Sequence, residues 1–221
     1  MSFDKFFFII TYMEELEEKK IIGLMSGTSC DSIDAAYCTI STDLNCKLIK
    51  GINYNYPSLV REKIFKAFAG DISVKELCQL NFEIGKCFAD AANILISELG
   101  KPDIISSHGQ TIYHYPENEY ENGISLKSTL QLGESSIIAK NTGCLTVSNY
   151  RESDIAHGGQ GAPFVCFADK IWFKNAAIQN IGGISNVTVV SDDFLPFGFD
   201  NGCGNIMIDY CVKKYFGTDY D

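Results

Sequence analysis

The segment from Ile21 to Asp34 constrains the fold of this chain more than any other segment. The apolar run at 20–24 predicts a buried strand, and the alternating run at 34–40 predicts a second strand. The residues between them predict a hairpin turn that offers hydroxyl groups and backbone N–H groups. Such a turn can hold an anion, although an ordinary hairpin connection uses the same residue types. A Walker-type phosphate loop is excluded, because GxxxxGK[ST] is absent and no lysine follows Gly27.

Composition indicates a globular protein with a packed core. The chain has 221 residues, of which 46% are hydrophobic, and a formal net charge of −10. An acidic chain without a basic block is a poor partner for nucleic acid or for an anionic membrane surface. Nine cysteines without CxxC spacing indicate free thiols in a reducing cytoplasm. The apolar run at 6–10 is too short to span a bilayer and lacks a cleavage site, so residues 1–18 are interpreted as an N-terminal extension.

Apolar periodicity predicts alternating strands and helices over the rest of the chain. The strongest helix begins at a capping box formed by Ser73 and Glu76 and ends at Gly100. Further helices are predicted at 57–70, 134–142, 164–173 and 205–215, and further strands at 46–56, 103–107, 128–132, 144–148, 176–181 and 187–190. Residues 117–127 are interpreted as a charged, solvated loop. The pattern as a whole predicts an α/β fold.

Two polar segments follow predicted strands in the first part of the chain. The strand at 103–107 is expected to end at SHGQT, where His108 could act as a base, a substrate partner or a structural histidine, and Gln110 suits a sugar hydroxyl. His114 is expected at the surface. The glycine-rich segment 149–163 is either a flexible loop or one that closes on a ligand, and Arg151 would then be the natural anchor for a carboxylate or phosphate.

The last part of the chain repeats the design of the first hairpin. A strand at 176–181 leads through Gly182 and Gly183 into another strand, which predicts a second phosphate-binding turn. Asp200 then stands among glycines before the last predicted helix, so it is the expected general base. Two such turns are what a two-lobed nucleotide clamp of the actin and sugar-kinase type needs.

Six motifs in order resemble the anhydro-N-acetylmuramic acid kinase family, which belongs to the actin-like, ribonuclease H-like sugar kinases. The motifs run from about residue 20 to the last residue: IGLMSGTSCDSIDAA, SHGQTIYH, LQLGESSIIAKNTG, VSNYRESDIAHGGQGAPFV, QNIGGISNVTV and GFDNGCGNIMID. The resemblance implies that water opens the 1,6-anhydro ring of anhydro-N-acetylmuramic acid while the γ-phosphate of ATP passes to O6, with Mg²⁺. The product, N-acetylmuramic acid 6-phosphate, belongs to cell-wall sugar recycling.

The resemblance also implies roles for single residues. Asp200 falls on the catalytic aspartate, and Asp31 would reach the metal through water. The nucleotide phosphates are expected at Ser26, Gly27, Thr28, Ser29, Cys30, Asp31, Ser32, Ile33, Asp34, Gly182 and Gly183. The sugar is expected at His108, Gln110, Arg151, Asp154, Gly158, Gly159 and Gln160. Arg151 is further expected to pair with the lactyl carboxylate of the sugar.

The domain organisation implied by the resemblance is an actin-like pair of lobes of which this chain holds the first and the opening of the second. Residues 19–175 would be the first lobe and residues 176–221 the incomplete second lobe, so the adenosine-binding segment would lie beyond residue 221. The family usually has Leu-Asp-Gly at 30–32 and Thr-Gly-Pro-Gly at 201–204, and this chain differs at both places but keeps both carboxylates. The alternative hypothesis is a short, non-catalytic paralogue that binds a sugar or a partner. A homodimer is left open.

Overall fold

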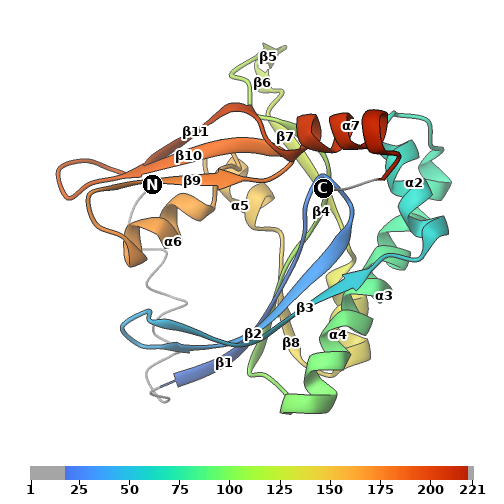
Figure 1. Cartoon of the computed structure of the whole chain (residues 1–221), viewed down its shortest axis with the longest axis horizontal. Coiled ribbons are helices and arrows are strands. Elements are labelled where there is room, and N and C mark those ends of the chain that lie inside the picture. Colours follow the sequence, from blue (N-terminus) through green and yellow to red (C-terminus); the bar gives the residue numbers. More distant parts are fainter. Residues whose placement is uncertain (1–17, 219–221) are drawn as a thin grey trace. The chain divides into compact units, whose positions relative to one another are not determined.

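The computed structural model describes residues 18–218 (Figure 1), so the apolar run at 6–10 and most of the expected N-terminal extension lie outside the described residues. The chain divides into two compact units, one ending at Gly161 and the other beginning at Ala162. The expected lobe boundary between residues 175 and 176 stays a prediction.

The first unit is an α/β unit. Its strands are β1 (Glu18–Ser26), β2 (Ser32–Ser41), β3 (Cys46–Asn55), β4 (Ile104–Tyr115), β5 (Tyr120–Glu121), β6 (Ile124–Ser125), β7 (Ser128–Leu132) and β8 (Leu145–Val147). Its helices are α2 (Ser58–Phe68), α3 (Val74–Leu99), α4 (Ser135–Thr142) and α5 (Tyr150–Ala156). None of the helices within residues 18–218 is long and apolar enough to cross a membrane.

The main sheet has the order β3-β2-β1-β4, with β7 and β8 both pairing with β4. Strand β2 runs antiparallel to both of its neighbours, whereas β1, β4 and β8 are mutually parallel. This order with these directions is that of the ribonuclease H-like fold. The expected α/β fold class, and the hairpin formed by β1 and β2, are therefore confirmed.

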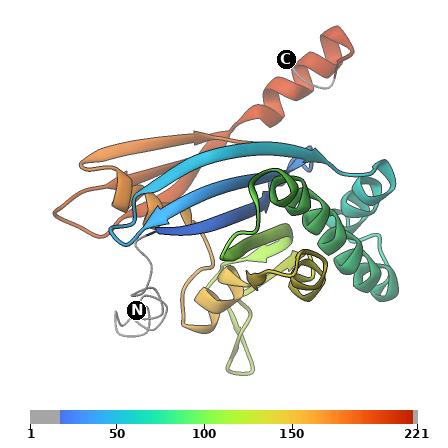
Figure 2. The same cartoon turned by 90° about the horizontal axis from the view of Figure 1, so that it is seen from below.

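Helix α3 covers one face of this sheet, with α4 beside it (Figure 2). Side-chain hydrogen bonds cap the N-terminus of α3. The Oγ of Ser73 accepts a hydrogen bond from the backbone N–H of Glu76, and the carboxylate of Glu76 accepts one from the N–H of Ser73. The predicted capping box is thus confirmed. Gly100, with φ of 87°, ends the helix as expected.

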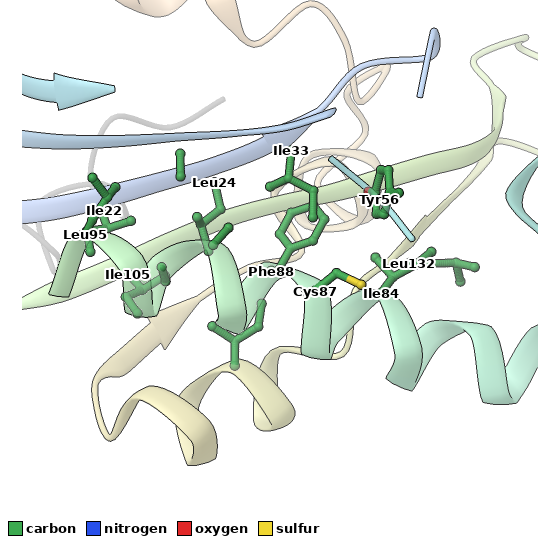
Figure 3. Close-up of a cluster of buried hydrophobic side chains, with 14 of the residues drawn as sticks. Ile22, Leu24, Ile33, Tyr56, Ile84, Cys87, Phe88, Leu95, Ile105 and Leu132 are labelled. Atoms are coloured by element: carbon green, nitrogen blue, oxygen red, sulfur yellow. The ribbon is translucent and has the colours of Figure 1, made fainter. Parts of the chain in front are cut away.

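The hydrophobic core lies between α3 and the strands (Figure 3). Alternate residues of β1, Ile22 and Leu24, point to α3, where Ile22 lies beside Leu95 and Phe88 lies near Leu24 and Ile33. Ile105 of β4 completes this layer. Farther along the same two strands, the buried residues are polar: Ser26 on β1 and Gln110 on β4. These buried polar side chains lie directly beside the β1–β2 turn.

Three segments differ from the sequence predictions. Strand β4 does not end at Ser107 but continues through SHGQT to Tyr115, because β7 pairs with its second half. The expected loop at 117–127 contains the small β5–β6 hairpin. The first half of the glycine-rich segment is the helix α5 rather than a loop.

The second unit is a three-stranded antiparallel sheet with two helices. Its elements are α6 (Val165–Trp172), β9 (Ala176–Ile181), β10 (Ile184–Val190), β11 (Phe197–Cys203) and α7 (Asn205–Phe216). Strand β10 lies in the middle of the sheet, and α6 packs against it. The sequence did not predict β11, which contains Asp200 and two glycines.

Candidate active site

The turn between β1 and β2 presents backbone N–H groups to solvent. The N–H of Cys30 donates to the carbonyl oxygen of Gly27 at 3.2 Å, which closes a tight turn, and Cys30 has a positive φ of 55°. Thr28 and Ser29 at its tip are exposed, and within residues 18–218 no hydrogen bond is found for their backbone N–H groups. Successive N–H groups in such a turn form a concave site for an anion. The geometry therefore suits the expected phosphate site.

A buried polar network of Ser26 and Gln110 supports this turn from the protein interior. The Oγ of Ser26 lies 2.7 Å from Oε1 of Gln110, and Nε2 of Gln110 donates to the carbonyl oxygen of Gly27 at 3.1 Å. Gln110 has no exposed surface. The structure gives Gln110 a different role from the expected sugar contact, because both polar atoms of its side chain are bonded inside the protein.

Arg61 of α2 supports the turn from the other side. Its Nε donates to the carbonyl oxygen of Cys30 at 3.0 Å, and its Nη2 lies 3.5 Å from Oδ1 of Asp31. Burial raises the pKa of the Cys30 thiol to about 12, so this cysteine is a buried neutral thiol rather than a nucleophile. The sequence offered no signal for Arg61, since one arginine in a surface helix is an ordinary feature.

A bulge in β4 reorients His108. Leu24 pairs with Ser107 and Met25 pairs with Gly109, so His108 is the extra residue. Gly109 has a φ of 77°, and a Cβ on it would come within 2.7 Å of the backbone oxygen of Leu132. Glycine is therefore required at this bulge.

His108 contacts Arg151 of α5. The Nε of Arg151 donates to Nε2 of His108 at 2.9 Å, while Nδ1 of His108 lies 3.0 Å from the carbonyl oxygen of Gly109. These partners fit a neutral imidazole that carries its proton on Nδ1. Burial lowers the pKa of His108, and the backbone contact and the positive charge of Arg151 act on it more weakly. Arg151 forms no ion pair with a carboxylate within residues 18–218, and the charge of Glu152 offsets only in part the lowering of the Arg151 pKa by burial.

The glycine-rich loop folds around Asp154. The Oδ2 of Asp154 accepts a hydrogen bond from the N–H of Gly161 at 2.8 Å. Gly159 packs so closely on the Asp154 carboxylate that a Cβ on Gly159 would overlap with the carboxylate. The carbonyl oxygen of Gly161 in turn accepts from Nη1 of Arg151. Gly158 and Gln160 are exposed on this loop.

His114 lies next to the same loop. The ring is half-buried, and its Nδ1 lies 3.1 Å from Oγ1 of Thr129. Burial lowers the pKa of His114. The expected surface position of His114 is therefore corrected to a packed position between β7 and the glycine-rich loop.

The second unit holds the remaining predicted residues. The carbonyl oxygens of Gly182 and Gly183 accept hydrogen bonds from the N–H groups of Asn205 and Gly204, so the glycine turn is fastened to the start of α7. Asp200 is exposed on β11 and pairs with Asn186, beside a bulge in the pairing of β10 with β11. Bulges of this kind are common beside active sites.

Metal-binding groups are few. No cluster of three or more histidine, cysteine, aspartate or glutamate side chains that could hold a metal occurs within residues 18–218. Asp31 is half-exposed beside the hydroxyl-rich turn, and Mg²⁺ prefers one or two carboxylates together with the phosphates of its substrate. The expectation that Asp31 reaches a Mg²⁺ ion through water therefore stays a prediction.

The sheet order and the turn at its centre define a ribonuclease H-like α/β protein. A sequence model of the family described as anhydro-N-acetylmuramic acid kinase matches residues 19–221. The chain belongs to this family.

Curated relatives agree with this assignment. The chain is 41% identical to an anhydro-N-acetylmuramic acid kinase of Caldanaerobacter subterraneus subsp. tengcongensis, over 90% of this chain and 54% of that protein. It is also 41% identical to the protein of the same name from Bacillus cereus strain Q1, over 91% of this chain and 56% of that protein. The chain thus spans about half the length of the curated relatives that it matches.

Among solved structures, the ethanolamine utilization protein EutJ from Carboxydothermus hydrogenoformans aligns over 90% of this chain and 57% of that chain. The alignment has a TM-score of 0.39 and 10% identity. A likeness of this size carries no argument about function.

Proposed function

We propose that this chain is part of an ATP-dependent kinase that opens the 1,6-anhydro ring of anhydro-N-acetylmuramic acid and phosphorylates O6. Family membership and the names of the relatives support the kinase class. The observation that supports the proposal is the presence of two groups in the first unit that can bind an anion: the N–H groups at the exposed residues Thr28 and Ser29, and the guanidinium of Arg151, which forms no ion pair with a carboxylate within residues 18–218.

The turn would hold the phosphates of ATP. Its N–H groups and the hydroxyl groups of Thr28 and Ser29 can donate to phosphate oxygens without reorganisation. Gly182 and Gly183 stay candidates for nucleotide contacts, as the sequence suggested. Mg²⁺ bound with ATP, near Asp31, would neutralise the charge of the transferring phosphoryl group.

The sugar would bind at the cluster of His108, Arg151 and Asp154. A lactyl carboxylate matches the planar fork of Arg151, which His108 and Gly161 hold in one orientation. The neutral His108 adds no second positive charge, and the loop around Gly158, Gly159 and Gln160 would close over the sugar hydroxyl groups. The cluster therefore favours a sugar acid over a neutral sugar.

The chemistry would place Asp200 as the general base. Asp200 would take a proton from water as the water oxygen attacks the anomeric carbon, and the bond from that carbon to O6 would break. The electron pair released on O6 would then attack the γ-phosphorus of ATP, which leaves ADP. Asp200 is exposed, so its carboxylate can reach water.

Sugar binding without phosphoryl transfer is a second candidate function. One observation favours it: His108, Arg151 and Asp154 all lie in the first unit, so a sugar acid could bind there independently of Asp200. Either function fits the cytoplasm expected from the sequence, where the nine cysteines, all free in the structure, would stay reduced.

The deciding experiment uses ATP, Mg²⁺ and anhydro-N-acetylmuramic acid, with the 6-phosphate followed by mass spectrometry. We expect product from a longer in-frame version of the chain, none from the 221-residue chain alone, and none from Asp200→Asn. Asp193→Asn, which changes another exposed carboxylate of the second unit, should keep activity. Sugar binding without product in every version would support the second candidate instead.

A further inference from the structure

Two side chains hold the carbonyl groups at the two ends of the turn from Gly27 to Asp31. Nε2 of Gln110 donates to the carbonyl oxygen of Gly27 at 3.1 Å. Nε of Arg61 donates to the carbonyl oxygen of Cys30 at 3.0 Å. The two side chains come from β4 and α2, so elements distant in sequence meet on one turn.

We propose that Gln110 and Arg61 are positioning residues that fix this turn for phosphate binding. The inference rests on the proposed function, because it assumes that the turn holds the phosphates of ATP. It gives Arg61 a role that neither its sequence context nor the family name suggests, and it replaces the expected sugar contact of Gln110.

The planarity of the peptide group explains how the two side chains act. In a trans peptide, C=O and the following N–H point in opposite directions. Fixing the carbonyl of Gly27 toward Gln110 directs the N–H of Thr28 away from the core. Fixing the carbonyl of Cys30 toward Arg61 directs the N–H of Asp31 away from α2. The orientations of both peptide groups are thereby restrained before a ligand arrives.

The orientation of Gln110 is itself determined by its neighbours. Its Oε1 faces Oγ of Ser26 at 2.7 Å, and its Nε2 faces two carbonyl oxygens, those of Gly27 and Thr111. Reversing the amide would place Oε1 against two acceptors, which burial would not tolerate. A satisfied network without exposed surface has one arrangement, so the turn above it has one arrangement too.

Arg61 adds a second restraint at the exposed end of the turn. Its guanidinium stacks over the ring of Phe65, 4.9 Å from the centroid, and lies 3.5 Å from Oδ1 of Asp31. The planar fork can serve the carbonyl of Cys30 and the carboxylate of Asp31 together, which a lysine cannot do. Arg61 therefore also restrains the carboxylate that would lie near the metal.

The test compares the kinetics of five single variants of the longer in-frame version of the chain. Gln110→Met and Arg61→Met remove the two contacts. Gln131→Met is the matched control for the first, since Gln131 bonds only to Thr111 and Thr129 among the described side chains. Lys63→Met is the control for the second, because Lys63 lies on the same helix and pairs with Glu83.

We expect Gln110→Met and Arg61→Met each to raise KM for ATP about fivefold or more, with KM for the sugar changed less than about twofold. The two controls should leave both values near those of the wild type, and Arg61→Lys should be intermediate. Equal changes of both KM values, or changes no larger than in the controls, would overturn the proposal.

Backbone hydrogen exchange separates this proposal from the proposed function. In the ligand-free protein, the amide of Cys30, which donates to the carbonyl oxygen of Gly27, should exchange about tenfold faster in Gln110→Met and Arg61→Met than in the two controls. Unchanged exchange would refute the restraint of the turn even if the wild type phosphorylates the sugar. A wild type that forms no product, but shows the faster exchange in both variants, would refute the proposed function and leave the restraint of the turn standing.

Discussion

Arg151 and His108 are joined by a 2.9 Å hydrogen bond from Nε of the arginine to Nε2 of the histidine, although they are 43 positions apart in the sequence. The contact requires the imidazole to be neutral, because Nε2 must accept. It leaves the guanidinium with its full charge and with the carbonyl oxygen of Gly161 as its other partner. Such an arrangement orients a cation without neutralising it.

Replacing Arg151 should weaken sugar binding selectively. Charge-assisted hydrogen bonds contribute about 1.5–3 kcal/mol, so Arg151→Gln should raise KM for the sugar about 10- to 100-fold. Arg151→Lys should recover little, because it loses the planar fork. The measurement is steady-state kinetics with varied sugar at saturating ATP. Lys140→Met, on the exposed side of α4, is the control, and an equal effect there would contradict the assignment.

Stability should fall as His108 becomes protonated. Burial lowers the pKa of His108 in the folded state from the usual 6.5, so the unfolded state takes up the proton first as pH falls. The stability is therefore intact above about pH 6.5 and decreases as pH falls toward the lowered pKa. Urea unfolding of the wild type between about pH 7.5 and about pH 5 should show a larger loss than unfolding of His108→Asn.

The histidine at 114 serves as the comparison. His114→Asn removes the other imidazole whose pKa burial lowers, so the two contributions can be separated. If His108→Asn keeps the full loss of stability of the wild type, His108 is not the group that titrates.

Gly159 and Asp154 should behave as a coupled pair. A methyl group at Gly159 would overlap with the Asp154 carboxylate, so Gly159→Ala should displace that carboxylate from the N–H of Gly161 and lower sugar affinity about tenfold or more. In an Asp154→Ala background the same change should have little further effect. Calorimetric titration of the sugar into the four proteins gives the coupling energy, expected at about 0.5–3 kcal/mol. Additive effects would show that the two residues act independently.

The capping box of α3 should contribute measurably to stability. Ser73→Ala removes the acceptor for the N–H of Glu76, and the free energy of unfolding should fall by about 0.5–2 kcal/mol. Ser58→Ala is the matched control at the start of α2, where no side-chain cap exists. Chemical unfolding followed by circular dichroism measures both, and equal effects would argue against the cap.

Elements whose signals are local could be predicted from sequence. The 26-residue helix α3 follows from its capping box, its apolar spacing and Gly100, all of which act within a few residues. The β1–β2 hairpin follows from alternation on either side of a turn. In contrast, α5 was missed because Asn149 begins it without a side-chain cap and glycines follow it. Strand β11 was missed because glycines lower strand propensity, and its strand conformation is stabilised by pairing with β10.

The residues of the candidate site also fall into those that the sequence suggested and those that only the structure revealed. Residue types and their spacing were enough to propose the turn at Gly27, the arginine at 151 and the glycines after it as site residues, since each carries its chemistry in its own side chain or backbone. The sequence did not reveal Arg61, and it suggested a sugar contact for Gln110. Both roles depend on contacts between distant segments: Gln110 on β4 and Arg61 on α2 each bond to the β1–β2 turn.

The sequence by itself therefore determined the α/β alternation, the β1–β2 hairpin and its donor-rich turn, because short-range periodicity and backbone preferences encode them. Only the tertiary structure decided that Gln110 supports the turn, since Ser26 and Gln110 are 84 positions apart and meet through the parallel pairing of β1 with β4. The same pairing introduces the bulge that directs His108 to Arg151. Hydrogen bonds between distant segments form only when the sheet brings their donors and acceptors within about 3 Å of each other, and no local pattern records that distance.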